Sequence, residues 1–172
     1  LPLAIVCVLS IPLVIAHQKQ WMTINVALGH LLSAILTAFL LWSVVLLISA
    51  LPEQKEKPIA LLRSAAVLWF TNILIFALWY WRLDAGGPHV RERREKHEDG
   101  AFLFPQMTLN EPWSPHFVDY LFLAFNTSTA FSPTDAPVLS RWAKVLMMVQ
   151  STISLTIIAV LAARAINILA PS

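Results

Sequence analysis

The sequence holds few of the residues that soluble enzymes and nucleic-acid-binding proteins depend on. Only 13% of its 172 residues are charged, and a formal net charge of +2 is too small to attract nucleic acid. The single cysteine, Cys7, excludes a disulfide bond within the chain. No nucleophile lies beside a base, and the sequence has neither an HExxH-like pair of metal ligands nor a glycine-rich phosphate loop. We therefore predict no enzymatic activity, no cofactor, no bound metal and no nucleic-acid partner.

Hydrophobic residues, by contrast, make up 58% of the chain, and the mean hydropathy is +0.67. This composition predicts an integral membrane protein whose main partner is the lipid bilayer. A helix needs roughly 20 apolar residues to cross a hydrocarbon core of ~30 Å, and four candidate runs span residues 1–16, 22–50, 59–81 and 138–169. The first run has an alternative as the core of a signal peptide, because Val-Ile-Ala before His17 resembles a cleavage site.

A fifth helical segment, 115–129, is too short to cross a bilayer. Ser114 and Pro115 favour a helix start there, and fifteen residues at ~1.5 Å each make about 22 Å. The predicted fold is therefore all-α, with four transmembrane helices and one re-entrant half-helix before the last of them. Two N-terminal transmembrane helices occupy residues 1–51. The second unit, 52–172, consists in order of an outer helix 59–81, a charged loop 82–114, the re-entrant helix 115–129, a turn 130–137 and the inner helix 138–169.

The segment 126-NTSTAFSPTDAP-137 follows the short helix. It falls without a gap on the T-x-T-T-V-G-Y-G-D signature of potassium channels, at Thr127, Ser128, Thr129, Ala130, Phe131, Ser132, Pro133, Thr134 and Asp135. This motif and the order of elements over 59–169 resemble the pore domain of tetrameric potassium channels. The turn is also similar to a family of uncharacterised bacterial membrane proteins that place Thr-Phe-x-x-x-Asp before a polar last helix. The resemblance implies a homo-oligomer, with a tetramer favoured, an ion as ligand, and a place in a bacterial inner membrane.

The resemblance stops where a potassium filter needs glycine. Glycines there let successive carbonyl groups point at the ion, but the four glycines of this chain lie at positions 29, 86, 87 and 100. Ser132, Pro133 and Thr134 stand at the Gly-Tyr-Gly positions. Proline fixes φ near about −65°, and a β-branched threonine resists positive φ. We therefore expect a degenerate filter that is closed or not selective for potassium.

The last predicted helix is unusually polar for a segment that faces lipid. Candidates for lining a pore, chosen by helical spacing, are Gln150, Ser154, Leu161, Arg164 and Ala165. As an alternative, its serines and threonines pack against other helices or bond to their own backbone. Arg164 either lies near the exit of the pore or reaches out to lipid headgroups. The sequence leaves both roles open.

Two ionisable residues are further candidates for function. His30 lies about nine residues past Trp21 in the second run, at an expected depth near the middle of the membrane, where an ionisable group suggests a proton-linked or ligand-binding role. The alternative is a neutral, hydrogen-bonded histidine, with Thr71 and Asn72 as possible partners. Asp135 either faces the mouth of a pore or caps the last helix.

Charged residues of the loop and of the short helix have simpler interpretations. The run RERREKHED predicts a solvated face. The alternative is a metal site, disfavoured because adjacent ligands on a helix diverge, built from His89, His97, Glu98 and Asp99. Asp119 is expected to pair with Arg141 or with a cation of the loop.

These features support two hypotheses of different classes. The first is a channel-like membrane protein, an ion channel whose filter is closed or not selective for potassium. The second is a non-conducting scaffold or regulatory subunit with a channel-like fold, and a proton-coupled transporter that uses His30 is a third. Orientation is open: a channel-like order of elements places residues 82–137 outside the cell, whereas their lysines and arginines favour the cytoplasm.

Overall fold

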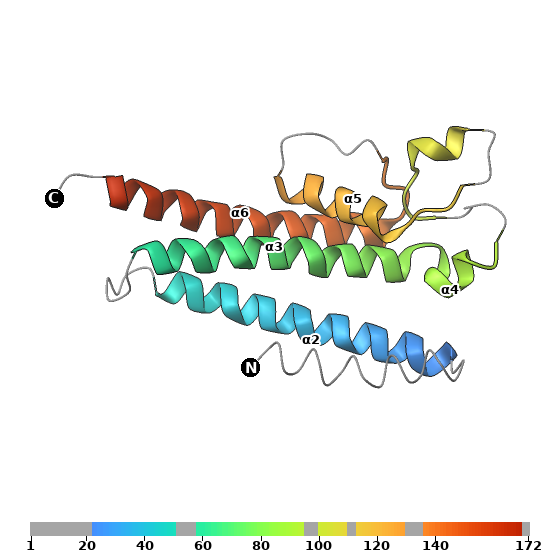
Figure 1. Cartoon of the computed structure of the whole chain (residues 1–172), viewed down its shortest axis with the longest axis horizontal. Helices are drawn as coiled ribbons and strands as arrows, with labels where there is room; N and C mark the ends of the chain where they lie inside the picture. The colour runs from blue at the N-terminus through green and yellow to red at the C-terminus, as the bar shows by residue number, and fades with distance from the viewer. Residues whose placement is uncertain (1–21, 51–57, 95–99, 110–112, 130–135, 170–172) are drawn as a thin grey trace.

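The computed structural model describes residues 22–50, 58–94, 100–109, 113–129 and 136–169 (Figure 1). The first predicted span, 1–16, lies outside the described residues. All regular secondary structure within the described ranges is helical. In chain order the elements are α2 (Met22–Ser49), α3 (Pro58–Leu83), η1 (Asp84–Gly86), α4 (Pro88–Arg91), η2 (Pro105–Thr108), α5 (Phe117–Thr129) and α6 (Arg141–Leu169).

Three helices of the described chain are long and apolar enough to cross a membrane. The qualifying stretches are Asn25–Ser49, Ile59–Gly86 and Arg141–Ala163. Large apolar side chains cover the outside of these helices, and Trp42 and Leu155 are 62% and 67% exposed. Exposed apolar surface on this scale is typical of contact with lipid or with another membrane helix. The expectation of an all-helical fold is therefore confirmed for the described residues, and their three candidate spans agree with a membrane protein.

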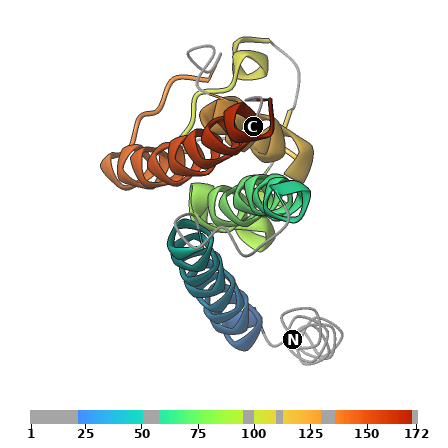
Figure 2. The same cartoon turned by 90° about the vertical axis from the view of Figure 1, so that its left-hand side faces the viewer.

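Helix α3 is the centre of the fold (Figures 1 and 2). It packs against α2 on one side and against α5 and α6 on the other. The side toward α5 and α6 carries Ile73, Phe76, Ala77 and Tyr80, all nearly inaccessible to solvent. Their spacing of three and four residues places them on one helical face.

The chain reverses direction sharply after α3. Ala85, Gly86 and Gly87 have φ values of 49°, 82° and 90°, which residues with side chains rarely adopt. Gly87 is also in close contact, because a Cβ added there would lie 3.0 Å from the carbonyl oxygen of Arg82. Pro88 then begins α4, where its missing N–H has no helical partner to lose. The outer helix was predicted to end at residue 81, and α3 ends two residues later, at Leu83.

A short backbone pairing fixes the start of α6 to the loop before α5. Phe102 and Val138 form an isolated antiparallel bridge, and the N–H of Leu103 donates to the carbonyl of Pro137 at 2.9 Å. The ring of Phe102 is completely buried and stands edge-on to Tyr80 at 5.3 Å between centroids. The two ends of the segment that contains α5 are therefore held together at one end of the bundle.

Helix α5 begins two residues later than expected, at Phe117 instead of 115, and the structure describes it to Thr129 as predicted. The carboxylate of Asp119 accepts a hydrogen bond from the backbone N–H of His116 at 2.8 Å. This bond satisfies an N–H group at the helix start, as an acidic side chain at the third helical position often does. The described polar contact of Asp119 is this cap, and not the expected pairing with Arg141.

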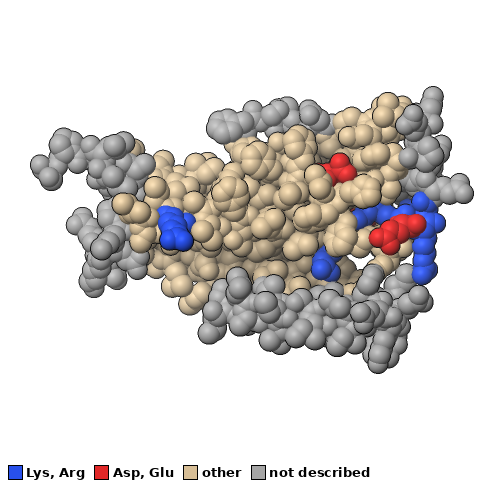
Figure 3. Space-filling model, in the orientation of Figure 1, with Lys and Arg blue, Asp and Glu red and all other residues tan. Residues whose placement is uncertain are grey.

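Charged side chains are unevenly placed along the bundle. Figure 3 shows most of the visible charge around the α4 end, one cationic patch near the opposite end, and an uncharged surface between them. The distribution agrees with a protein whose middle lies in hydrocarbon and whose ends lie in water.

Candidate functional site at the end of helix α5

The last turn of α5 lies against the middle of α6. The hydroxyl of Ser154 donates to the carbonyl of Ser128 at 2.6 Å, and that of Ser151 donates to the carbonyl of Thr127 at 3.2 Å. Carbonyls in the last turn of a helix have no partner within the helix. Both serines lie at the centre of the apolar stretch Arg141–Ala163, where lipid supplies no hydrogen bond. Donors from α6 therefore allow α5 to end beside the middle of an apolar helix.

Gln150 joins three helices from a completely buried position. Its Nε2 donates to the carbonyl of Ala124 at 2.7 Å and to the hydroxyl oxygen of Ser128 at 2.8 Å. Its Oε1 accepts from the hydroxyl of Tyr80 at 2.5 Å. One amide therefore connects α6 with α5 and with α3. Because buried polar atoms are costly when unpaired, this amide contributes to stability through all three bonds.

Two further side chains of α3 complete this network. The indole N–H of Trp69 donates to Oγ of Ser154 at 3.1 Å. Nδ2 of Asn72 lies 3.4 Å from the hydroxyl oxygen of Ser128 and 3.4 Å from the carbonyl of Gln150. Oδ1 of Asn72 is buried and accepts no hydrogen bond from any of the described residues. Asn72 is the least satisfied member of the network.

A second polar cluster lies at the opposite end of α5. Asp84 is completely buried, and its carboxylate accepts from the hydroxyl of Tyr120 at 2.6 Å and from the N–H of Ala101 at 2.5 Å. Arg91 is also buried, donates to the backbone carbonyl of Asp84 at 2.6 Å, and places its guanidinium 5.1 Å from the centre of the Tyr120 ring. The cluster connects the end of α3, helix α4, the loop and the start of α5.

The ionisation of this second cluster follows from its burial. Burial raises the pKa of the Tyr120 hydroxyl far above its ordinary value, and the negative charge and hydrogen bond of Asp84 raise it further. Burial lowers the pKa of Arg91, whereas the nearby Tyr120, Asp84 and Glu92 raise it. Tyr120 is therefore a neutral hydrogen-bond donor to Asp84 at physiological pH.

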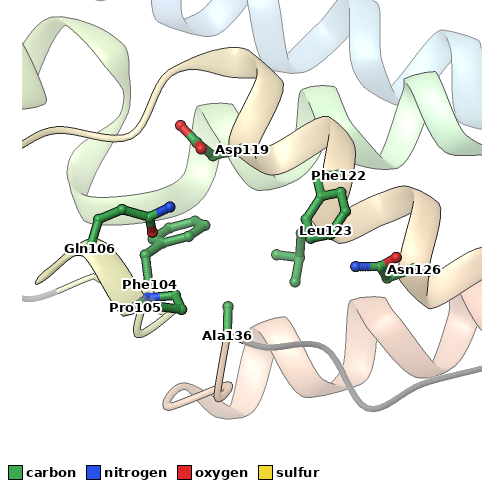
Figure 4. A pocket seen from close by; sticks show the side chains of 8 residues that line it. All are labelled: Phe104, Pro105, Gln106, Asp119, Phe122, Leu123, Asn126 and Ala136. Atoms are coloured by element: carbon green, nitrogen blue, oxygen red, sulfur yellow. The ribbon is translucent and has the colours of Figure 1, made fainter. Parts of the chain in front are cut away.

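A small cavity lies on the outer side of α5 (Figure 4). It measures about 110 Å³ and is lined by Phe104, Pro105, Gln106, Asp119, Phe122, Leu123, Asn126 and Ala136. Liquid water occupies ~30 Å³ per molecule, and ligand pockets usually exceed ~300 Å³. This cavity has room for a few waters and is too small for a larger ligand.

The predicted filter motif is only partly within the described residues. Thr127 and Ser128 are buried against α6, and the hydroxyl of Thr127 also donates to the carbonyl of Leu123 at 2.8 Å. The hydroxyl of half-buried Thr129 donates to the carbonyl of Asn126 at 3.0 Å. The rest of the motif lies outside the described residues: Ala130, Phe131, Ser132, Pro133, Thr134 and Asp135. The two roles considered for Asp135 remain predictions.

The candidates for lining a pore differ in their burial. Gln150 and Ser154 are buried within the chain, where they hold α5. Leu161 is half-buried against the hydrophobic core. The side chains of Arg164 and Ala165 lie outside the described residues. Polarity of α6 is thus explained in part by its contact with α5, as the packing alternative expected, and pore lining remains a prediction.

His30 and His89, the two candidate histidines within the described residues, make other contacts than those considered from the sequence. The His30 ring stacks on Trp79 at 6.0 Å between centroids, and its Nε2 is buried with no partner among the described residues. Thr71 donates instead to the carbonyl of Val67. His89 bonds through Nε2 to the side chain of Asn25 at 3.2 Å. Within the described ranges no three potential metal ligands gather, and residues 95–99 lie outside those ranges.

Sequence reasoning missed Tyr80, Asp84, Arg91 and Tyr120 as members of polar clusters. Tyr80 stands between two tryptophans near the end of α3, and its hydroxyl donates to Gln150 inside the bundle. Asp84 stands just before Gly86 and Gly87, in a segment that the sequence marks only as a loop. An acid beside a tight turn at the end of a span was the available signal.

No family model, no curated protein and no solved structure matches this chain. The resemblance to potassium-channel pores rests on residues 126–137 and on the order of elements, and it remains a prediction.

Proposed function

We propose that α3, α5 and α6 form a channel-like pore unit in which α5 is a re-entrant half-helix. The supporting observation is that α5 ends beside the centre of α6, where Ser151 and Ser154 bind its terminal carbonyls. Its 13 residues cover about 20 Å at ~1.5 Å each, short of the ~30 Å that a span needs. Such a helix enters the hydrocarbon region and must turn back within it.

In this proposal α5 directs the negative end of its dipole toward the middle of the membrane. The segment that returns, 130–137, carries Ser-Pro-Thr where a potassium filter has Gly-Tyr-Gly. The filter is therefore closed or not selective for potassium. The assembly is a homo-oligomer, with a tetramer favoured, and α6 is the helix nearest to its axis, in a bacterial inner membrane.

One observation favours the alternative of a non-conducting scaffold or regulatory subunit. Gln150 and Ser154, the most polar candidates for a pore wall, already bond to Ala124, Ser128 and Tyr80 of the same chain. Side chains used in this way stabilise a fold and do not need an ion. Both functions are compatible with the same half-helix, so only transport measurements separate them.

Charge placement favours one orientation for this unit. In the sequence most lysines and arginines lie from Arg82 to Lys144, between the end of α3 and the start of α6, and fewer lie at the other ends of these helices, at Lys55, Lys57, Arg63 and Arg164. By the positive-inside rule the α4 end faces the cytoplasm, and α5 enters from that side. This orientation is opposite to that of potassium-channel pores.

Flux through purified protein in liposomes tests the proposal. We expect cation flux that falls when Asp135→Asn removes a charge from the turn, whereas Arg63→Gln, at the far end of α3, leaves the flux unchanged. The oligomer mass is measured on the same samples. No flux under any ion gradient from an intact oligomer would contradict the channel proposal and support the scaffold. Flux that requires a proton gradient and His30 would support the transporter instead.

A further inference from the structure

We propose that the contact between α2 and α3 is a binding site for an anionic group, a phosphate or a carboxylate, held by Arg82 and His30. The site is separate from the α5–α6 contact, on the other side of α3. It does not depend on whether the protein conducts ions.

Arg82 provides the charge of this site. Its guanidinium lies directly on the backbone of α2 at Gly29, so closely that a Cβ added to Gly29 would overlap Nη1. Nε of Arg82 is buried and has no hydrogen-bond partner among the described residues. The Trp81 ring lies 6.0 Å from the guanidinium carbon. Arg82 therefore approaches α2 without a carboxylate partner in the described contacts.

His30 provides a second polar group beside the first. It directly follows Gly29 in α2, and its ring stacks on Trp79 at 6.0 Å, with 27° between the planes. Trp79 and Arg82 are three residues apart in α3 and lie on neighbouring positions of one face. Nε2 of His30 is buried, without a partner among the described residues. Two buried, unsatisfied nitrogen atoms therefore belong to adjacent contacts of the same helix pair.

The chemistry of these groups selects an anion. A guanidinium has five N–H donors and no acceptor, and its planar shape matches the oxygens of phosphate and carboxylate. A histidine that carries a proton on Nε2 is also a donor. Buried donor atoms without an acceptor are costly, so an oxyanion that accepts from Nε of Arg82 and from Nε2 of His30 would stabilise the contact. Asp84, the acid closest in sequence to Arg82, receives hydrogen bonds from Tyr120 and Ala101.

The anionic group bound at this site can come from two sources. Tryptophans such as Trp79 and Trp81 concentrate where a membrane meets water, so the phosphate of a lipid headgroup can reach Arg82 from the bilayer. A free anion such as inorganic phosphate can reach it from the aqueous end of the bundle. Gly29 matters for either source, because a side chain at this position would displace the guanidinium from where it now lies.

The test measures the thermal unfolding midpoint of the purified full chain. One series adds inorganic phosphate to protein in detergent, and a second compares vesicles of phosphatidylglycerol with vesicles of phosphatidylcholine. We expect a higher midpoint with phosphate, with phosphatidylglycerol, or with both. Stabilisation by phosphatidylglycerol alone identifies a lipid headgroup, and stabilisation by phosphate in detergent identifies a free anion.

Three variants assign the effect to the site. Arg82→Gln should weaken the half-maximal response at least about tenfold, as expected for the loss of a charge-assisted hydrogen bond. Arg63→Gln, an exposed cation on the same helix, is the matched control and should respond like the parent protein. Gly29→Ala keeps every charge but displaces the guanidinium, and should also weaken the response. Equal responses from the parent and from Arg82→Gln, or no response to either anion source, would overturn the proposal.

Discussion

Helix α3 has a polar contact on each side, and the two contacts differ in how their hydrogen bonds are completed. Toward α5 and α6, the chain supplies partners for nearly every buried group around Gln150. Toward α2, Nε of Arg82 and Nε2 of His30 have no partner among the described residues. A contact that satisfies itself stabilises the fold, whereas a contact that leaves donors unsatisfied favours a ligand. The two sides of one helix therefore differ in how fully their buried polar groups are paired, as the proposed anion site requires.

The largest expected loss of stability comes from disrupting the contact of α3 with α5 and α6, where nearly all the buried polar groups around Gln150 have partners. Gln150→Leu removes the partners of Tyr80, Ala124 and Ser128 at once and leaves the Tyr80 hydroxyl buried without an acceptor. We expect unfolding in mixed micelles, followed by circular dichroism, to show a loss of about 3 kcal/mol or more.

The matched control for this variant is Thr152→Ala, two residues away on the exposed face of α6. The hydroxyl of Thr152 bonds only to the carbonyl of Met148 in its own helix. Its loss should change stability by about 0.5 kcal/mol or less. Equal losses of unfolding free energy for the two variants would show that the network around Gln150 contributes no more to stability than a single exposed hydroxyl.

A smaller effect is expected at the cluster that fixes the start of α5. Tyr120→Phe removes one of the two described donors to the Asp84 carboxylate and should cost about 1–2 kcal/mol at neutral pH. Asp84→Asn should act in the same direction, because an amide cannot accept from both donors through equivalent oxygens.

The same cluster predicts a pH dependence. Because the folded-state pKa of Tyr120 is raised, the protonated hydroxyl stabilises the fold fully below its unfolded pKa of about 10, and this stability is lost as pH rises above about 10. Thermal unfolding between pH 8 and pH 11 should show a steeper loss for the parent protein than for Tyr120→Phe. Parallel curves would contradict the role assigned to this hydroxyl.

The smallest effect on stability is expected at the contact of α3 with α2, where Arg82 and His30 each have a nitrogen atom without a partner among the described residues. Gly29→Ala improves helix propensity by about 1 kcal/mol but displaces Arg82, and we expect the net change in stability to stay within about 1 kcal/mol. Its response to phosphate or to phosphatidylglycerol should nevertheless fall. A large loss of stability together with an intact anion response would reverse the roles given to the two sides of α3.

Much of the fold could be predicted from composition and length. Runs of apolar residues predicted α2, α3 and α6 almost to their ends, and the charged loop predicted from residue 82 begins close to the end of α3 at Leu83. The start of α5 was misplaced by two residues because Ser114 and Pro115 gave a strong helix-start signal. The cap made by Asp119 lies three residues inside the helix and depends on the side chain turning back to His116.

The site was harder to predict, because it depends on which faces of the helices meet. The spacing of Gln150 and Ser154 correctly predicted one polar face on α6, but lining a pore and packing against α5 give the same pattern. Tyr80 bonds to Gln150, which is 70 residues away in the sequence, and Asp84 bonds to Tyr120, which is 36 residues away. Contacts over such separations follow from the packing of the bundle and leave no local pattern.

The most direct test of the central proposal measures how deeply α5 enters the bilayer. Val118 and Phe125 lie on the outer face of α5, 68% and 42% exposed, and about 10 Å apart along the helix. Spin labels at these positions, introduced singly as cysteines in a Cys7→Ser background, report depth through relaxation by oxygen and by a water-soluble nickel chelate. A half-helix predicts that the label at 125 is more accessible to oxygen and less accessible to nickel than the label at 118. Equal accessibility at the two positions, with nickel reaching both, would show that α5 lies outside the hydrocarbon and would contradict the proposal.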